Sequence, residues 1–505
     1  MTVKQFSPDP DRLAAYGRKH IGDGGEFIVK NLKPMFGGAS RFTYRFDYSG
    51  QRHGEQVEAS AILRCIPPDG GVSPADARKE YKVLTAVYNK GYPVPEPIAY
   101  CSNLDALGCE FLIMEEIKGC DATLEALMEE PYVSQRESIG KDCWTLLGTL
   151  ATYDPVELGL VAEDKALAYA SGWLKMLESQ EKIFRASSVY VDPITEAVFG
   201  WLRHNPPPPP QKPAICHGDF RSGNFLYAAD GRIKSILDWE IWSIGDPLCD
   251  LAFSLLPLWA DEDGRVGRLL KREDAITLWE QASGLKADPD ALRWWEVYCC
   301  QRFMATNHNI YKRFLTGSAI DGQIPLAMLG WGPRVEKYAL ELITRNSPQT
   351  RTLPATEKLD MSSASFQNTV AKVLAGPLKE QVADSSWWSM QCEKLAAITR
   401  YSVAESRTST AYKADELEAM QGIFTLALQA FGDNHPLSNP LKETLGRPQD
   451  FAFLRNINGA LDDARRLIVA IHKVVFESPQ QLPALDKQLW DLYALTASQK
   501  LSLVP

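Results

Sequence analysis

The feature that most constrains this chain is a polar segment at residues 217–224, His-Gly-Asp-Phe-Arg-Ser-Gly-Asn. Asp219 and Asn224 stand five residues apart, and Asp238 follows fourteen residues later, at the end of an apolar, strand-like run. This spacing lets one loop present a carboxylate and an amide oxygen to one cavity, with a second carboxylate arriving from the strand end. The pattern predicts a site that handles a hydroxyl proton and a hard cation.

These are the parts that phosphoryl transfer from ATP requires: a base for the acceptor hydroxyl and oxygen ligands for magnesium. Taken singly, each part has a structural explanation. His-Gly-Asp often marks a turn, and an Asp that ends a strand often caps a helix. Because Asp219, Asn224 and Asp238 occur together in this order, they favour the catalytic interpretation.

The residues before this segment alternate like strands. We expect strands over Glu26–Leu32, Thr43–Tyr48, Ala59–Ile66 and Glu110–Ile117. The apolar spacing changes to a helical period over Ala75–Tyr88. The first two strands flank a turn with Gly37, Gly38 and Ser40, whose backbone amides and hydroxyl can approach phosphate oxygens. An ordinary hairpin is the alternative for this turn.

The combined motifs resemble the aminoglycoside phosphotransferase and choline kinase family, small-molecule relatives of the protein kinases. The resemblance covers roughly residues 20–345 and rests on the HGDxxxxN segment, the Leu-Asp-Trp-Glu run at Asp238, and Gly245-Asp246-Pro247 followed by Asp250. It implies an α+β, protein-kinase-like two-lobed fold, in which an antiparallel sheet with a helix forms the N-lobe and helices dominate the C-lobe.

The resemblance also implies roles for single residues. Asp219 would be the catalytic base, Asn224 and Asp238 the magnesium ligands, and His217 a brace for the catalytic loop. Asp246 and Asp250 are interpreted as structural residues that cap and brace the following helix.

The nucleotide site would use further residues of the N-lobe. The glycine turn would cover ATP, and Arg64 would hold its phosphates while paired with Glu80, where relatives usually have Lys. For Glu80 the alternative is a solvated helix charge. Met114 and Glu115 would line the adenine pocket through backbone hydrogen bonds.

The acceptor is predicted less directly. The segments around Asp219 and Asp238 are most similar to kinases that act on 4-hydroxyacyl-CoA thioesters, and Arg221 would then meet a carboxylate or phosphate of the substrate. The alternative is that Arg221 anchors the loop. One departure is Gly223, where those relatives often have Asp. The preferred acceptor is a hydroxyacyl-CoA or hydroxy acid in catabolism, and the alternative is an aminoglycoside- or choline-type alcohol.

A helix expected over residues 290–315 is aromatic and basic, which suits an anionic acceptor better than a polycation. Its aromatic residues could equally be core, and its basic residues solvated. The sequence singles out these side chains: Trp294, Trp295, Tyr298, Arg302, His308, Tyr311, Lys312 and Arg313.

Composition changes along the chain suggest four parts. We expect an N-lobe over residues 1–117, a C-lobe over 118–345, a linker over 346–361 rich in Ser, Thr and Pro, and an all-helical accessory domain over 362–505. The accessory domain carries no recognisable catalytic constellation. Holding the substrate or joining subunits into a homo-oligomer is its hypothetical role.

The net charge of −10 argues against a nucleic-acid partner, because phosphate backbones are held by clustered Lys and Arg. There is no apolar run long enough to span a bilayer. The ten cysteines contain no CxxC pair, which indicates reduced thiols and a cytoplasmic location. A protein kinase is disfavoured by the absence of HRD and DFG motifs, and a nucleotide-binding pseudokinase scaffold is the remaining alternative of another class.

Overall fold

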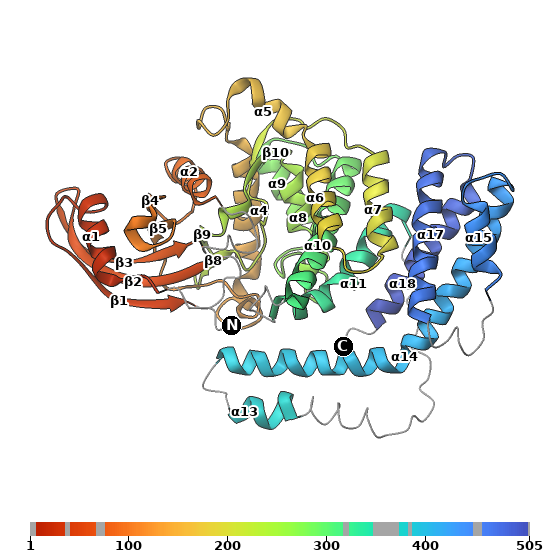
Figure 1. Cartoon of the computed structure of the whole chain (residues 1–505). Helices are drawn as coiled ribbons and strands as arrows, with labels where there is room; N and C mark the ends of the chain where they lie inside the picture. Colours follow the sequence, from red (N-terminus) through yellow and green to blue (C-terminus); the bar gives the residue numbers. More distant parts are fainter. Residues whose placement is uncertain are drawn as a thin grey trace. The chain divides into compact units, whose positions relative to one another are not determined.

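A computed structural model describes residues 7–35, 41–66, 76–316, 323–346, 373–381, 386–447 and 457–502. The chain divides into two compact units. The first, here called the sheet unit, combines Met1–Gly172 with Pro208–Trp295. The second, the helical unit, combines Trp173–Pro207 with Glu296–Pro505. Figure 1 shows the elements of both.

The sheet unit begins with a five-stranded antiparallel sheet of order β1-β2-β3-β5-β4. Alternate residues of β2, among them Tyr44, Phe46 and Tyr48, are buried in one core with Leu63 and Phe111, as expected for a sheet with one face packed inward. The strands are β1 (Phe27–Met35), β2 (Phe42–Arg52), β3 (Glu55–Cys65), β4 (Pro97–Cys101) and β5 (Phe111–Glu115). The four strands predicted from alternation are therefore confirmed.

The helix predicted from the apolar spacing is α2, Ala77–Tyr88. Asp76 caps its N-terminus by accepting from the Lys79 N–H, which satisfies a backbone donor that has no partner within the helix. Its buried face carries Val83, Leu84 and, unusually, Glu80. A shorter helix, α1 (Pro10–His20), contacts β1.

The remainder of the sheet unit is mainly helical. Two small antiparallel sheets, β6-β8-β9 and β7-β10, carry the segments that hold the candidate site. The strands are β6 (Cys120–Asp121), β7 (Ala214–Cys216), β8 (Phe225–Ala228), β9 (Ile233–Ile236) and β10 (Ser243–Gly245). The main helices are α4 (Arg136–Thr152), α5 (Glu163–Ala170), α8 (Leu248–Ser254), α9 (Arg272–Ser283) and the first residues of α10 (Pro289–Leu315).

The helical unit joins segments that are far apart in the sequence. Helix α7 contacts α17, and α18 contacts both α11 and α14. The α7–α17 contact is close: a Cβ on Gly200 would lie 2.2 Å from the Phe476 ring. The main helices are α6 (Trp173–Ser187), α7 (Pro193–His204), α11 (Gln323–Thr344), α14 (Ser386–Phe431), α15 (Ser438–Leu445), α17 (Ile457–Glu477) and α18 (Pro483–Ser502).

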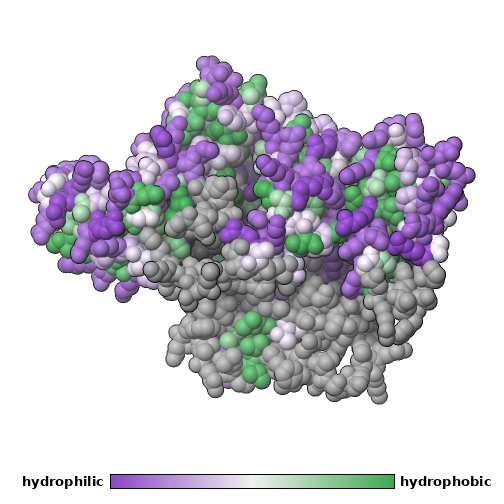
Figure 2. All heavy atoms as spheres, viewed as in Figure 1, coloured by the Kyte–Doolittle hydropathy of each residue, from purple (hydrophilic) through white to green (hydrophobic). Residues whose placement is uncertain are grey.

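The predicted fold class is confirmed: an antiparallel N-terminal sheet with a helix, a mainly helical C-lobe and an all-helical C-terminal region. Hydrophilic side chains cover most of the described surface around α1 and β1 on the face shown in Figure 2. Among the described residues, none of the helices is long and apolar enough to cross a membrane.

Candidate functional site

Residues 217–224 form a loop between β7 and β8, and a buried carboxylate holds the backbone of this loop in place. Asp250, on α8, accepts hydrogen bonds from the backbone N–H groups of His217 and Gly218, the latter at 2.8 Å. The His217 ring is fully buried, and its Nδ1 accepts from the Asp219 N–H at 3.2 Å. Its Nε2 must then carry the proton, which it donates to the Leu237 carbonyl at 2.8 Å. The imidazole thus ties the loop of residues 217–224 to Leu237, the residue before Asp238.

Gly218 is required by this loop, and we expect Gly218→Ala to be costly. Its φ of +86° is unfavourable for other residues, and a Cβ would lie 2.6 Å from the Ile241 carbonyl oxygen. Left-handed backbone alone costs about 1–2 kcal/mol. Gly91→Ala is the matched control, because Gly91 has a φ of +76° with nothing within 4 Å of its Cβ. Urea unfolding should show a larger loss for Gly218→Ala. Equal losses would contradict the steric argument.

The Asp219 carboxylate is held by two donors. Asn224 Nδ2 donates to Oδ2 at 2.7 Å, and Arg221 Nε donates to Oδ1 at 3.2 Å. The Arg221 guanidinium also lies over the Trp259 ring, 4.8 Å from its centroid, an arrangement that stabilises a cation. The side chain of Asp219 keeps about a fifth of its surface exposed, so a hydroxyl can reach it. The predicted catalytic residues therefore lie together in one loop.

The two predicted magnesium ligands lie on adjacent backbone segments. The Leu237 N–H donates to the Asn224 carbonyl at 2.8 Å, which places Asp238 beside Asn224. Because Asn224 donates through Nδ2, its Oδ1 points elsewhere and can serve as an oxygen ligand. Asp238 has a left-handed backbone, with φ 66° and ψ 59°, a conformation that Asp tolerates better than most residues. Burial opposes ionisation of Asp238, but the neighbouring Arg64 outweighs it and lowers the pKa of the carboxyl.

This donor set fits magnesium. One carboxylate and one amide oxygen suffice when the nucleotide phosphates provide further oxygens, which is how Mg²⁺ is commonly bound. Within the described ranges, no group of three His, Cys, Asp or Glu side chains is arranged to hold a metal on its own. A metal here would therefore depend on phosphate ligands.

Arg64 and Glu80 meet as an ion pair, with Arg64 Nη1 2.8 Å from Glu80 Oε1. The Glu80 side chain is 1% exposed, so the solvated alternative for this residue is wrong. Arg64 Nη2 also contacts Asp238 Oδ1 at 3.0 Å. Burial acts to lower the pKa of Arg64, yet the charges of Glu80 and Asp238 prevail and raise it.

Two residues of this cluster were not predicted from the sequence. Arg41 Nη1 lies 2.7 Å from the second Glu80 oxygen, and Arg41 Nε lies 3.4 Å from Glu240 Oε2. Glu240 in turn approaches Arg64 Nη2 at 3.7 Å. The position of Glu240, two residues after Asp238, was the available signal. Nothing comparable marks Arg41.

Other residues were predicted to bind the nucleotide, and the structure describes only some of them. Gly37, Gly38 and Ser40 lie outside the described residues, between the paired ends of β1 and β2 at Met35 and Thr43. Met114 and Glu115 end β5, where Met114 is buried. The Glu115 N–H already donates to the Glu96 carbonyl at 3.0 Å. An adenine bond in this region would have to use another backbone group.

The structural interpretation of Asp246 agrees with its contacts. Asp246 Oδ1 accepts from the Leu248 N–H at the start of α8, and Oδ2 accepts from the Trp295 indole at 3.0 Å. Asp250 braces the loop of residues 217–224 through both of its carboxylate oxygens. Trp294, Trp295 and Tyr298 are each at most 2% exposed, so these aromatic residues are core.

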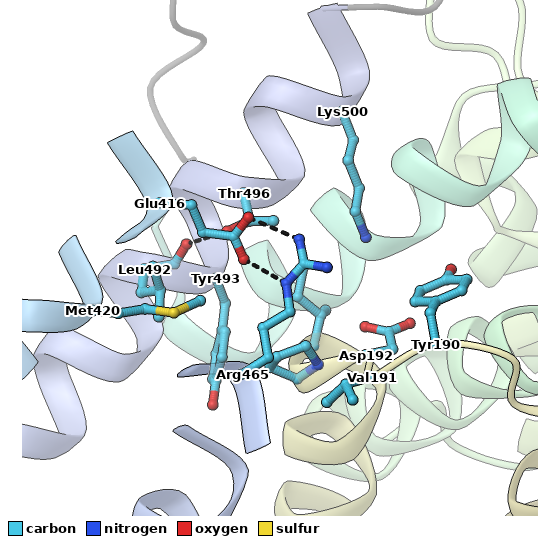
Figure 3. Close-up of a pocket in the computed structure, with 12 residues that line it drawn as sticks. Tyr190, Val191, Asp192, Glu416, Met420, Arg465, Leu492, Tyr493, Thr496 and Lys500 are labelled. Carbon is cyan, nitrogen blue, oxygen red and sulfur yellow. Dashed lines mark hydrogen bonds and ion pairs between the residues drawn. The ribbon is translucent and has the colours of Figure 1, made fainter. Parts of the chain in front are cut away.

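A pocket of the helical unit is lined by charged and aromatic side chains (Figure 3). The segment before α7 provides Tyr190 and Asp192, whereas α14, α17 and α18 provide Glu416, Arg465 and Lys500. Its charges are already paired within the protein. Arg465 donates to both Glu416 oxygens at 2.8 Å, and Lys500 Nζ donates to both Glu336 oxygens at 2.9 Å. The charged residues of this pocket therefore form a buried ion-pair network.

Asp192 belongs to the same network, since it accepts from the His308 ring at 3.1 Å. Burial alone would raise the pKa of Asp192, but the charges of Lys500 and His308 lower it. His308 was a candidate acceptor residue in the sequence. Its buried contact with Asp192 gives it a structural role in this unit.

Comparison with known proteins adds a family and several relatives. The model of the family described as "Phosphotransferase enzyme family" matches residues 31–295, just over half of the 505 residues. Acyl-CoA dehydrogenase family member 11 from Rattus norvegicus is 28% identical over 335 residues, covering 63% of this chain and 41% of the relative. Its Homo sapiens counterpart is 31% identical over 205 residues, covering 39% and 25%. The chain thus spans less than half of these relatives.

Among solved structures, a protein assigned as an aminoglycoside phosphotransferase from Ralstonia eutropha superposes with a TM-score of 0.54. It shares 21% identity, and the alignment covers 67% of this chain and 99% of that protein. At this identity the similarity concerns the fold, and it agrees with the predicted two-lobed architecture.

Proposed function

Because this chain belongs to the phosphotransferase enzyme family, we propose that it transfers the γ-phosphoryl group of ATP to a hydroxyl group of a small molecule. One observation carries the proposal. A single loop holds Asp219 between Asn224 and Arg221, with Asp238 on the adjacent segment. The residues that we assign as base and metal ligands thereby lie beside the Arg64–Glu80 pair.

In the proposed reaction, Asp219 accepts a hydrogen bond from the acceptor hydroxyl and takes up its proton as the hydroxyl oxygen bonds to the γ-phosphorus. The bond from that phosphorus to the β–γ bridging oxygen breaks, and ADP is the leaving group. The bonds from Asn224 and Arg221 fix the carboxylate so that its exposed edge faces the hydroxyl. Arg64 binds phosphate oxygens and is oriented by Glu80. Magnesium, held by Asn224 Oδ1 and Asp238, would neutralise charge on the phosphates.

The acceptor we favour is a hydroxyacyl-CoA or a related hydroxy acid. Arg221 supports an anionic acceptor, because its guanidinium lies beside Asp219 and stacks on Trp259. The names of the curated relatives supply a second indication, since they refer to acyl-CoA dehydrogenases. Aminoglycoside- and choline-type alcohols are the competing acceptors.

An acceptor panel tests this assignment. Release of ADP from Mg-ATP is followed with 3- and 4-hydroxyacyl-CoAs, the free hydroxy acids, aminoglycosides and choline-type alcohols. We expect a hydroxyacyl-CoA to give the highest kcat/KM. A faster aminoglycoside or choline-type alcohol would overturn the choice of acceptor. Tight nucleotide binding without turnover of any acceptor would favour the pseudokinase scaffold.

Two further assignments belong to the same proposal. None of the ten cysteines, all of which lie within the described residues, forms a disulfide, as expected for the reducing, cytoplasmic location that we propose. A homo-oligomer formed through residues 362–505 stays a prediction, as do the four domain boundaries.

A further inference from the structure

Four side chains of the sheet unit form a closed ring of alternating charge, here called the charge ring: Arg41, Glu80, Arg64 and Glu240. Arg41 contacts Glu80 at 2.7 Å, and Glu80 contacts Arg64 at 2.8 Å. Arg64 then approaches Glu240 at 3.7 Å, and Glu240 returns to Arg41 at 3.4 Å. Within the ring each arginine therefore meets two carboxylates and each carboxylate two arginines, and Arg64 also contacts Asp238 outside the ring at 3.0 Å.

The side chains of the charge ring are largely buried. The side chains of Arg41 and Glu80 are each 1% exposed, and those of Arg64 and Glu240 are 15% and 13% exposed. Charges buried this deeply are stable only when paired, and loss of one partner leaves the other uncompensated. The four positions should therefore behave as a unit rather than as independent contacts.

The ring joins every element expected to touch the nucleotide phosphates. Arg41 directly follows the predicted glycine turn, Arg64 lies on β3, and Glu80 lies on α2. Glu240 follows Asp238 by two residues. One electrostatic cluster thus connects the end of the turn, the phosphate-binding cation, its helix and the metal-binding segment.

We propose that Arg41 and Glu240 are positioning residues for the nucleotide phosphates: they hold Arg64, directly or through Glu80, in the geometry that binds the triphosphate. Arg64 contacts both Asp238 and Glu240. Because Glu240 competes for the guanidinium, it weakens the ion pair between Arg64 and Asp238. Arg41 binds the second oxygen of Glu80 and so fixes the carboxylate that orients Arg64. The inference rests on the proposed function, since it assumes that ATP binds here.

A double-mutant cycle tests the proposal. Arg41→Met, Glu240→Gln and the double variant are compared by the calorimetric Kd for AMP-PNP, with magnesium and with EDTA. We expect each single variant to weaken binding at least tenfold under both conditions. The double variant should bind no more weakly than the poorer single variant, because both buried charges are removed together.

The control cycle uses Arg136→Met and Asp261→Asn, a largely buried ion pair of the sheet unit whose members lie 2.8 Å apart and carry no role in the proposed site. It should change the AMP-PNP Kd by less than twofold, although it lowers the unfolding midpoint. A change in unfolding alone for the Arg41–Glu240 cycle, as in this control, would show a merely structural role. If Arg41→Met does not fold, Arg41→Lys keeps the charge but cannot span both carboxylates, and it should still weaken AMP-PNP at least threefold.

The remaining outcomes are distinguishable. If the two substitutions weaken AMP-PNP binding additively, and only when magnesium is present, Glu240 is a metal ligand and the positioning role is overturned. Wild-type protein that binds no AMP-PNP would overturn the proposed function itself. Normal AMP-PNP binding by every variant, alongside a functional wild type, would overturn only this inference.

Discussion

Asp219→Asn is expected to lower kcat by about 10²–10⁴-fold, the contribution typical of a positioned general base. The substituted amide keeps the size of the side chain, and one of its atoms can still accept from Asn224. It cannot take up the proton of the acceptor hydroxyl, and its NH₂ group would face the Arg221 Nε donor. The affinity for AMP-PNP should change by less than twofold, because Asp219 contacts neither Arg64 nor Asp238.

The measurement is kcat with the best acceptor of the panel, at saturating Mg-ATP. Asp230→Asn is the control, since Asp230 lies in the exposed turn between β8 and β9, paired with Lys234. That variant should retain wild-type kcat. Retention of more than a tenth of the wild-type kcat by Asp219→Asn would contradict its assignment as the base.

Arg465→Met is expected to destabilise the helical unit by about 3 kcal/mol, near the lower end of the cost of breaking a buried ion pair. Arg465 binds both oxygens of Glu416, whose side chain is 6% exposed. Removing the guanidinium leaves that carboxylate buried without its partner. The Arg465 side chain itself is 19% exposed, which limits the loss.

Chemical denaturation tests this prediction when the unfolding transition of the helical unit is followed separately from that of the sheet unit. The double variant Arg465→Met/Glu416→Gln should recover most of the stability, because no charge is then left alone. Lys487→Met, which breaks the exposed pair with Asp491, should cost less than about 0.5 kcal/mol. If Arg465→Met lowers the free energy of unfolding by less than 1 kcal/mol, the Arg465–Glu416 pair contributes little to stability.

The clustering of the candidate site residues could be predicted from the sequence because most of them are close together in the chain. Asp219 and Asn224 belong to one loop, and Asp238 follows within a short strand pairing, so their spacing carries the geometry. The Arg64–Glu80 pair was also within reach, since strand and helix are consecutive. Arg41 was missed because an arginine after a turn has no local sign of burial. Its partner Glu240 lies about 200 residues further along the chain.

The helical unit shows a different limit. An amphipathic pattern identifies the apolar face of α7 or α17 but not the helix that covers it. The contact between Gly200 and Phe476, and the ion pair between Lys500 and Glu336, join residues 276 and 164 positions apart. Helix periodicity carries no information on such pairings, so the grouping of 173–207 with 296–505 was not among the predictions.

The discontinuous helical unit has a consequence for synthesis on the ribosome. Helix α7 emerges roughly 250 residues before α17, the helix that covers it. At about 5–20 residues per second, this interval lasts on the order of 10–50 s. During that time the part of α7 at Gly200 and His204, which meets Phe476 of α17 in the finished protein, would lack that partner. Nascent chains of this protein should therefore be chaperone clients until the last helices have left the exit tunnel.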